Sequence, residues 1–93
     1  MTSTEPVQHE EDLQETATQE PAKVILFNDD IHTFEEVIGQ LMKALRCTGE
    51  KAEALAWEVH SKGKAVVFSG EITRCMEVSA VLQEIGLFTQ IEV

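Results

Sequence analysis

From residue 23 onward, hydrophobic and polar positions follow patterns that predict three strands and three helices. Residues 23–27 (KVILF) form an apolar run typical of a strand buried on both faces, and the Asn-Asp-Asp sequence after it is typical of a turn. A capping box at Thr33 and Glu36 then predicts the start of a helix. The apolar face of this helix repeats at helical spacing through Phe34, Val37, Ile38, Leu41 and Leu45.

A second helix is expected between two glycines. Gly49 separates it from the first helix, and Gly63 is suited to cap its C-terminus. Its apolar stripe consists of Ala52, Leu55, Ala56 and Val59. Trp57 falls off this stripe, so its side chain is expected either in solvent or over an edge of the domain.

The rest of the chain adds two strands and one helix. Residues 64–69 (KAVVFS) predict a strand, residues 71–85 a helix stopped by Gly86, and residues 88–93 a half-buried edge strand. The resulting order, β-α-α-β-α-β, predicts an α+β fold. It is a small two-layer sandwich, in which a three-stranded antiparallel sheet carries three helices on one face.

Charge divides the 93-residue chain into two parts. Residues 1–22 contain six acidic residues, no Lys or Arg and few large apolar side chains. Such a segment buries too little apolar surface to offset its chain entropy, so we expect a disordered acidic tail. Residues 23–93 are then long enough to form a single core domain.

Composition argues against several classes of function. The net charge of -10 disfavours binding to a nucleic-acid backbone, which requires clustered Lys and Arg. No apolar run reaches the roughly 18 residues of a membrane helix, and no secretory signal is visible. Cys47 and Cys75 lack CxxC or metal-ligand spacing, so we expect reduced core cysteines in a cytoplasmic protein.

A polar cluster, Asn28, Asp29, Asp30 and His32, together with His60, is the part of the sequence least explained by folding alone. In one interpretation these are turn and surface residues without a ligand. In a second, the carboxylates and imidazoles bind a metal ion, although no HxxxH or DxD spacing supports this. In a third, amide, carboxylate and neutral imidazole acceptors receive an ammonium group beside an apolar pocket. Sequence spacing alone does not show that His60 reaches Asn28.

Two motifs in this region resemble a known family. Residues 23–38 (KVILFNDDIHTFEEVI) resemble the first strand and helix of ClpS, the adaptor of the bacterial Clp protease, whose hallmark is Asn-Asp-Asp after a hydrophobic strand. Residues 58–67 (EVHSKGKAVV) resemble the Val-His-x-x-Gly-Lys segment of that family. Together with the ending GLFTQIEV, the similarity covers residues 23–93.

The resemblance implies an adaptor rather than an enzyme, and we expect no cofactor or metal. Nothing in the sequence demands more than a monomer. The resemblance also implies that Asn28, Asp29 and His60 bind the free α-amino group of a substrate protein. The bulky first side chain of that protein (Leu, Phe, Tyr or Trp) would enter a hydrophobic pocket formed by Ile31, His32, Phe34, Val37, Ala56, Val59 and Leu87. The implied partner is the N-terminal domain of an AAA+ Clp unfoldase of the ClpA or ClpC type, docked near Glu71.

A second possibility is a protein interaction module of the same fold that lacks this amine-binding pocket. Four positions depart from the ClpS pattern and bear on that choice. Phe34 and Ala56 stand where methionine is common, so that Phe34 would narrow the pocket and Ala56 would widen it. Met76 stands where the family tends to carry lysine, and His32 where a small hydroxyl residue is common.

The acidic tail gives a first prediction, because in ClpS proteins the N-terminal extension engages the unfoldase during delivery. Deletion of residues 1–20 is expected to leave ligand affinity unchanged and to slow the degradation of a model substrate by the unfoldase and its peptidase. The measurement is the loss of substrate fluorescence with time. Degradation at the rate seen with the full chain would show that the tail is inert.

Overall fold

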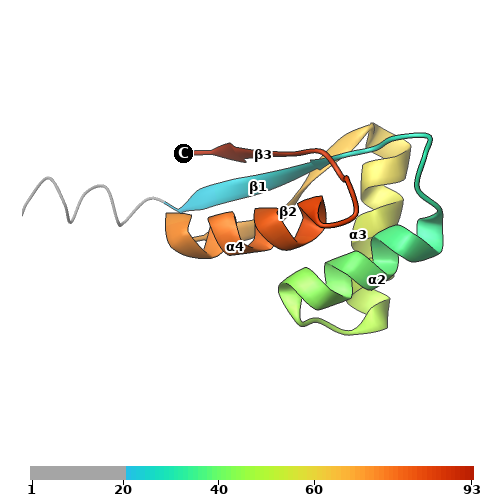
Figure 1. Ribbon diagram of the computed structural model, residues 1–93, viewed down its shortest axis with the longest axis horizontal. Helices are drawn as coiled ribbons and strands as arrows, with labels where there is room; N and C mark the ends of the chain where they lie inside the picture. The colour runs from blue at the N-terminus through green and yellow to red at the C-terminus, as the bar shows by residue number, and fades with distance from the viewer. Residues whose placement is uncertain (1–20) are drawn as a thin grey trace, which may run out of the picture.

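The structure, a computed structural model, describes residues 21–93 and confirms the expected order of elements (Figure 1). The strands and helices are β1 (Ala22–Phe27), α2 (Phe34–Leu45), α3 (Gly49–Lys62), β2 (Lys64–Gly70), α4 (Ile72–Gln83) and β3 (Thr89–Glu92). Nearly all of the expected acidic tail lies outside the described residues. Its last residue, Ala22, is already part of β1 and is buried in the core.

β1 is the central strand of the sheet, in the order β2-β1-β3, and it pairs antiparallel with both neighbours. Pairing on both edges is consistent with its uninterrupted apolar run, in which successive side chains point to opposite faces of the sheet. Val24 and Leu26 are fully buried, and Ile25 between them is only 7% exposed. The expected double burial of this strand and the edge position of β3 are both confirmed.

The helices form the second layer of the fold (Figure 1). α4 lies along the sheet and contacts all three strands, α3 contacts β2, and α2 packs against α3 and α4. The largest fully buried side chains are Leu26, Leu41, Leu82, Val24, Val78 and Cys75. The sheet and α4 therefore share one core, and the pair α2 and α3 extends it beyond the end of β1.

The boundaries of α2 are set by its caps, and one boundary of α3 differs from that expected. The capping box is confirmed, since Thr33 Oγ1 accepts from the Glu36 amide at 3.1 Å and Glu36 Oε1 accepts from the Thr33 amide at 2.8 Å. Gly49 does not separate the helices, because Thr48 caps α3 and makes Gly49 its first residue. The chain turns instead at Arg46, in a left-handed conformation with φ of 55°.

α4 is shorter than expected, and Ile85 lies in the following turn instead of on the apolar face of the helix. The helix ends at Gln83, and Gly86 provides the positive φ of 87° that directs the chain back toward the sheet. Buried hydroxyls hold the two arms of this turn together, with Ser79 Oγ and Thr89 Oγ1 2.5 Å apart. The turn therefore leads directly from α4 into β3.

Cysteine placement agrees with the sequence analysis. Cys75 is fully buried in the core and Cys47 is half-buried, and both thiols are free. The helices within residues 21–93 are each too short or too polar to cross a membrane.

The packing of α4 predicts the effect of a core substitution. Leu82 is fully buried, and its replacement by Ala leaves a cavity, so we expect Leu82→Ala to lower the free energy of unfolding by about 2–5 kcal/mol. Ile72→Ala on the same helix is the control, because Ile72 is 44% exposed and its loss should cost about 0.5 kcal/mol or less. Urea unfolding followed by circular dichroism measures both. Equal losses would contradict this view of the core.

Candidate functional site

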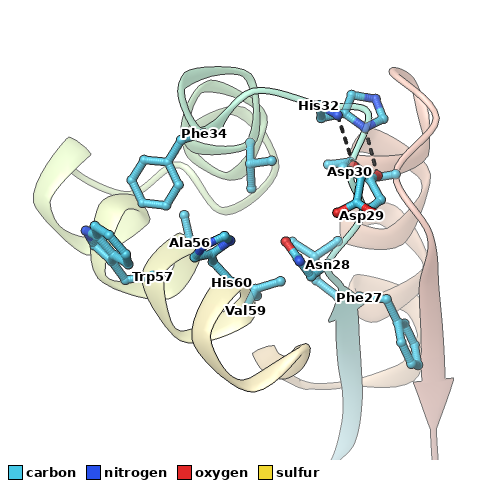
Figure 2. Close-up of a pocket in the computed structure, with 13 residues that line it drawn as sticks. Phe27, Asn28, Asp29, Asp30, His32, Phe34, Ala56, Trp57, Val59 and His60 are labelled. Carbon is cyan, nitrogen blue, oxygen red and sulfur yellow. Dashed lines mark hydrogen bonds and ion pairs between the residues drawn. The ribbon is translucent and has the colours of Figure 1, made fainter.

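A pocket of about 520 Å³ opens where the end of β1 meets α2 and α3 (Figure 2). It lies at the junction of three parts of the chain that are distant in sequence: residues 26–37, which run from the end of β1 into α2, residues 56–60 of α3, and Leu87 before β3. Its lining residues are Leu26, Phe27, Asn28, Asp29, Asp30, His32, Phe34, Val37, Ala56, Trp57, Val59, His60 and Leu87.

Two backbone hydrogen bonds fix the polar end of the pocket. The Phe27 amide donates to the Phe88 carbonyl at 3.1 Å, and the Asn28 amide donates to the Gly63 carbonyl at 2.9 Å. The end of β1 is thereby held between β3 and the turn that follows α3. Figure 2 shows the result: the Asn28 side chain points toward His60, which stands on the last turn of α3.

Asp29 orders the loop between β1 and α2. Its Oδ1 accepts the amides of Ile31 and His32, each at 3.0 Å, and its Oδ2 accepts from His32 Nδ1 at 2.8 Å. These bonds use three of the roughly four acceptor positions of a carboxylate. The His32 amide, followed by the His32 ring, lowers the pKa of Asp29 against the opposing effect of burial. Asp29 is therefore ionised at neutral pH, with one acceptor position left over.

His32 joins this loop to the turn after α4. Besides its contact with Asp29, its Nε2 lies 2.5 Å from the Ile85 carbonyl oxygen. The Ile85 carbonyl, followed by the Asp29 carboxylate, raises the pKa of His32. The His32 side chain is only 11% exposed, so the ring is held against the protein at the rim of the pocket.

The other end of the pocket is apolar. Ala56, Val59 and Leu87 are each less than 5% exposed, and they form its floor together with the partly buried side chains of Phe34 and Val37. Because position 56 carries only a methyl group, α3 leaves open space between itself and α2. An apolar chamber therefore adjoins the acceptor groups of the loop.

Trp57 lines the pocket, which the sequence pattern did not indicate. Its ring centroid lies 4.9 Å from that of Phe34 and 5.9 Å from that of His60, so it connects the apolar and polar ends. Although 54% exposed, it therefore covers an edge of the pocket (Figure 2). The one available signal was its position three residues before His60, which places both side chains on the same side of a helix.

The structure brings most of the expected site residues together. Asn28, Asp29 and His60 line the same pocket, and so do six of the seven residues expected to receive the side chain. The exception is Ile31, which is absent from the lining and 84% exposed. Glu71 lies outside the pocket, at the start of α4. Within residues 21–93, no group of three His, Cys, Asp or Glu side chains is arranged to hold a metal ion.

Comparison with known proteins identifies the family. Residues 17–87 match the family model for the ATP-dependent Clp protease adaptor protein ClpS. The chain belongs to the ClpS family. The structure of ClpS2 from Agrobacterium tumefaciens bound to L-phenylalaninamide has the same fold, with a TM-score of 0.73 and 24% identity over 78% of this chain and 95% of that one.

Relatives of this ClpS-family chain include two kinds of protein. The ATP-dependent Clp protease adapter protein ClpS of Thermosynechococcus vestitus is 43% identical over 49 residues, or 52% of each chain. The E3 ubiquitin-protein ligase UBR2 of Mus musculus is 35% identical over 72 residues, which are 77% of this chain. The chain thus spans about half of the ClpS relative and only 4% of the ligase.

The hydrogen bonds of Asp29 predict how stability depends on pH. Because folding lowers the pKa of Asp29, its ionised carboxylate stabilises the fold above pH 3.8. This contribution is lost as the pH falls through the folded-state pKa. Asp29→Asn retains an oxygen for the two amides but removes the charge. We expect the variant to unfold at lower urea concentration than the native chain near neutral pH, and this difference to disappear in acid.

The matched control for this prediction is Asp30→Asn, since the Asp30 carboxylate makes no hydrogen bond within residues 21–93 and its charge should contribute little. Urea midpoints of the native chain and both variants, measured from acid to neutral pH, provide the comparison. A difference between Asp29→Asn and the native chain that does not change with pH would contradict an ionised, hydrogen-bonded Asp29.

Proposed function

We propose that this ClpS-family protein binds the free N-terminal α-amino group and the bulky first side chain of substrate proteins, and delivers them to a Clp-type AAA+ unfoldase. The observation that carries this proposal is the pocket itself, in which unused hydrogen-bond acceptors adjoin an apolar chamber. A peptide that begins with a large hydrophobic residue presents an ammonium group and an apolar side chain on one carbon atom.

The acceptors match an ammonium group in number and in kind. An ammonium has three N–H donors and no acceptor, so each donor needs an oxygen or a lone pair. Asp29 has one acceptor position left, and no hydrogen bond within residues 21–93 uses the side-chain oxygen of Asn28 or the ring of His60. These three groups supply one acceptor for each donor, and hydrogen bonds to a charged group contribute about 1.5–3 kcal/mol each.

The chamber matches a large side chain. A pocket of about 520 Å³ has room for an aromatic ring, and the methyl group of Ala56 leaves the floor open between α2 and α3. Burying one aromatic side chain removes about 150–250 Å² from water, which stabilises the complex by about 4–6 kcal/mol before ordering costs. The ClpS2 structure was solved with L-phenylalaninamide, a compound with a free amine and a phenyl side chain, which supports the same class of ligand here.

Delivery is the second part of the proposal. The family is described as the adaptor of an ATP-dependent Clp protease, so the partner would be the N-terminal domain of a ClpA- or ClpC-like unfoldase. Glu71 and the exposed residues Ile72 and Met76 at the start of α4 are the candidate docking surface. In this proposal the protein is a cytoplasmic, non-catalytic monomer, and the unfoldase and peptidase carry out the chemistry.

Fluorescence anisotropy with a labelled peptide tests ligand binding. A peptide beginning with Phe is expected to bind, and the same peptide with an acetylated N-terminus is expected to lose nearly all affinity, because acetylation removes the charge and two of the three N–H donors. Asn28→Ala should also weaken binding, by about tenfold for one lost hydrogen bond to a charged group. Glu53→Ala, an exposed position of α3 outside the pocket lining, is the matched control and should bind like the native chain.

The same assay distinguishes the proposal from an interaction module without an amine site. Affinities of peptides that begin with Leu, Tyr, Trp and Ala show which first side chains the chamber prefers. The Ala peptide should bind worst because it buries the least surface. Ala56→Leu fills the chamber and should weaken the Trp and Phe peptides more than the Leu peptide. Failure of every free-amine peptide to bind would refute amine recognition and leave the interaction module.

A further inference from the structure

We infer that His32 is a positioning residue that acts as a protonated clamp: its imidazolium ties the Asp29 carboxylate to the turn after α4 and so fixes the amine-binding end of the pocket. The effect of this clamp on the ligand rests on the proposed function. The charge state of His32 does not, and it can be measured on the free protein.

The geometry of the ring requires two donors. Nδ1 lies 2.8 Å from the Asp29 carboxylate and Nε2 lies 2.5 Å from the Ile85 carbonyl oxygen, and both of these partners only accept hydrogen bonds. A neutral imidazole has one N–H and one lone pair, so one of the two contacts would bring a lone pair against an oxygen. The imidazolium donates to both at once. The two contacts together therefore select the charged form.

The surrounding charges favour the same form. Asp29 faces the ring from the loop, and Glu36 on α2 adds a second negative charge. In the turn after α4, the titratable neighbour Glu84 is paired with Lys43 at 2.8 Å, and the group that meets His32 is the Ile85 carbonyl. These groups, the Ile85 carbonyl first and then Asp29, raise the pKa of His32 above 6.5.

The clamp connects two walls of the pocket. On one side it holds Asp29 Oδ2, while two backbone amides hold Oδ1, so the remaining acceptor position of this carboxylate has a fixed direction. On the other side it holds Ile85, two residues before the pocket residue Leu87. The ring also lies close to Gly86 in this turn. A side chain at position 86 would touch the ring, since a Cβ there would lie 3.9 Å from it.

Loss of the proton opens this connection. A neutral His32 keeps at most one of its two contacts, so either the Asp29 carboxylate or the turn that leads to Leu87 is released. Because the His32 pKa is raised in the folded state, the clamp is complete below pH 6.5. It is lost as the pH rises through the folded-state pKa of His32. Repulsion between the imidazolium and the ligand ammonium opposes this effect, but the Asp29 carboxylate, which contacts the imidazolium and in the proposed function also the ammonium, offsets the repulsion.

The charge state is tested by NMR on the free ¹⁵N-labelled protein. The imidazole nitrogens of His32, assigned by comparison with His32→Gln, are followed in long-range ¹H–¹⁵N spectra as the pH is raised. We expect the titration midpoint to lie above pH 6.5, so that the imidazolium is the predominant form at that pH. A midpoint at or below 6.5, or a neutral tautomer at pH 6.5, would overturn the inference.

The effect on the ligand is tested by comparing the native chain with His32→Gln, whose amide is uncharged and cannot donate at both ends. Affinity for the labelled Phe peptide is measured from about pH 5.5 to 8.5, a range that spans the unperturbed histidine pKa. Titration of the ligand amine is common to both proteins, so the ratio of their dissociation constants isolates His32. We expect the variant to bind about fivefold more weakly, or worse, at low pH. The ratio should approach one at high pH.

Lys43→Ala is the matched control, since it removes the exposed ion pair to the same turn without touching the His32 ring. Its effect on affinity should be small and independent of pH. A ratio near one at every pH for His32→Gln, or tighter binding by that variant at low pH, would overturn the role of the clamp. If neither protein binds the peptide, the proposed function fails, and the NMR midpoint still decides whether His32 is the charged residue inferred here.

Discussion

The hydrogen bonds on both edges of β1 determine where the pocket forms. As the central strand, β1 is paired on either side, and at its end the amides of Phe27 and Asn28 bond to the carbonyls of Phe88 and Gly63. The chain therefore leaves the sheet at a defined point with its polar loop already positioned. Loss of either bond would leave a strand end free to move, and the groups of the pocket depend on that end.

The loop after β1 is ordered by one of its own side chains, Asp29. Asp29 spends most of its acceptor capacity on two backbone amides and one imidazole, all within the next three residues. Local hydrogen bonds of this kind compete with regular secondary structure, and here they hold a short irregular segment between a strand and a capped helix. The carboxylate thus has its position and charge in the free protein, which would reduce the ordering cost of the proposed binding.

Sequence patterns predicted the elements well where a single local rule governs them. The apolar run of β1 and the capping box of Thr33 and Glu36 are examples, and both are confirmed. The rules failed where two signals competed. Glycine at position 49 suggested a break between helices, but the cap at Thr48 makes Gly49 helical. Ile85 continues the apolar period of α4, although the helix itself ends at Gln83.

The pocket was less predictable than the fold, for a physical reason. Residues 28–32 and 56–60 line one pocket because of how α3 packs, and only the resemblance to ClpS suggested this proximity. Trp57 was missed because its contacts are with Phe34 on another helix and lie outside the apolar stripe. The carbonyl of Ile85 was missed because a backbone acceptor leaves no trace in residue type.

Ala56 has a consequence for how this pocket could change over time. The Ala56 side chain is a single methyl group, so the pocket floor at this position lies close to the backbone of α3. Only glycine is smaller, and it would weaken the helix by about 1 kcal/mol. From this position, nearly every substitution adds volume to the floor. The α3 wall therefore stands near the wide limit of its range: variants can narrow the chamber in small steps, whereas a wider one would require α2 or the turn before β3 to move.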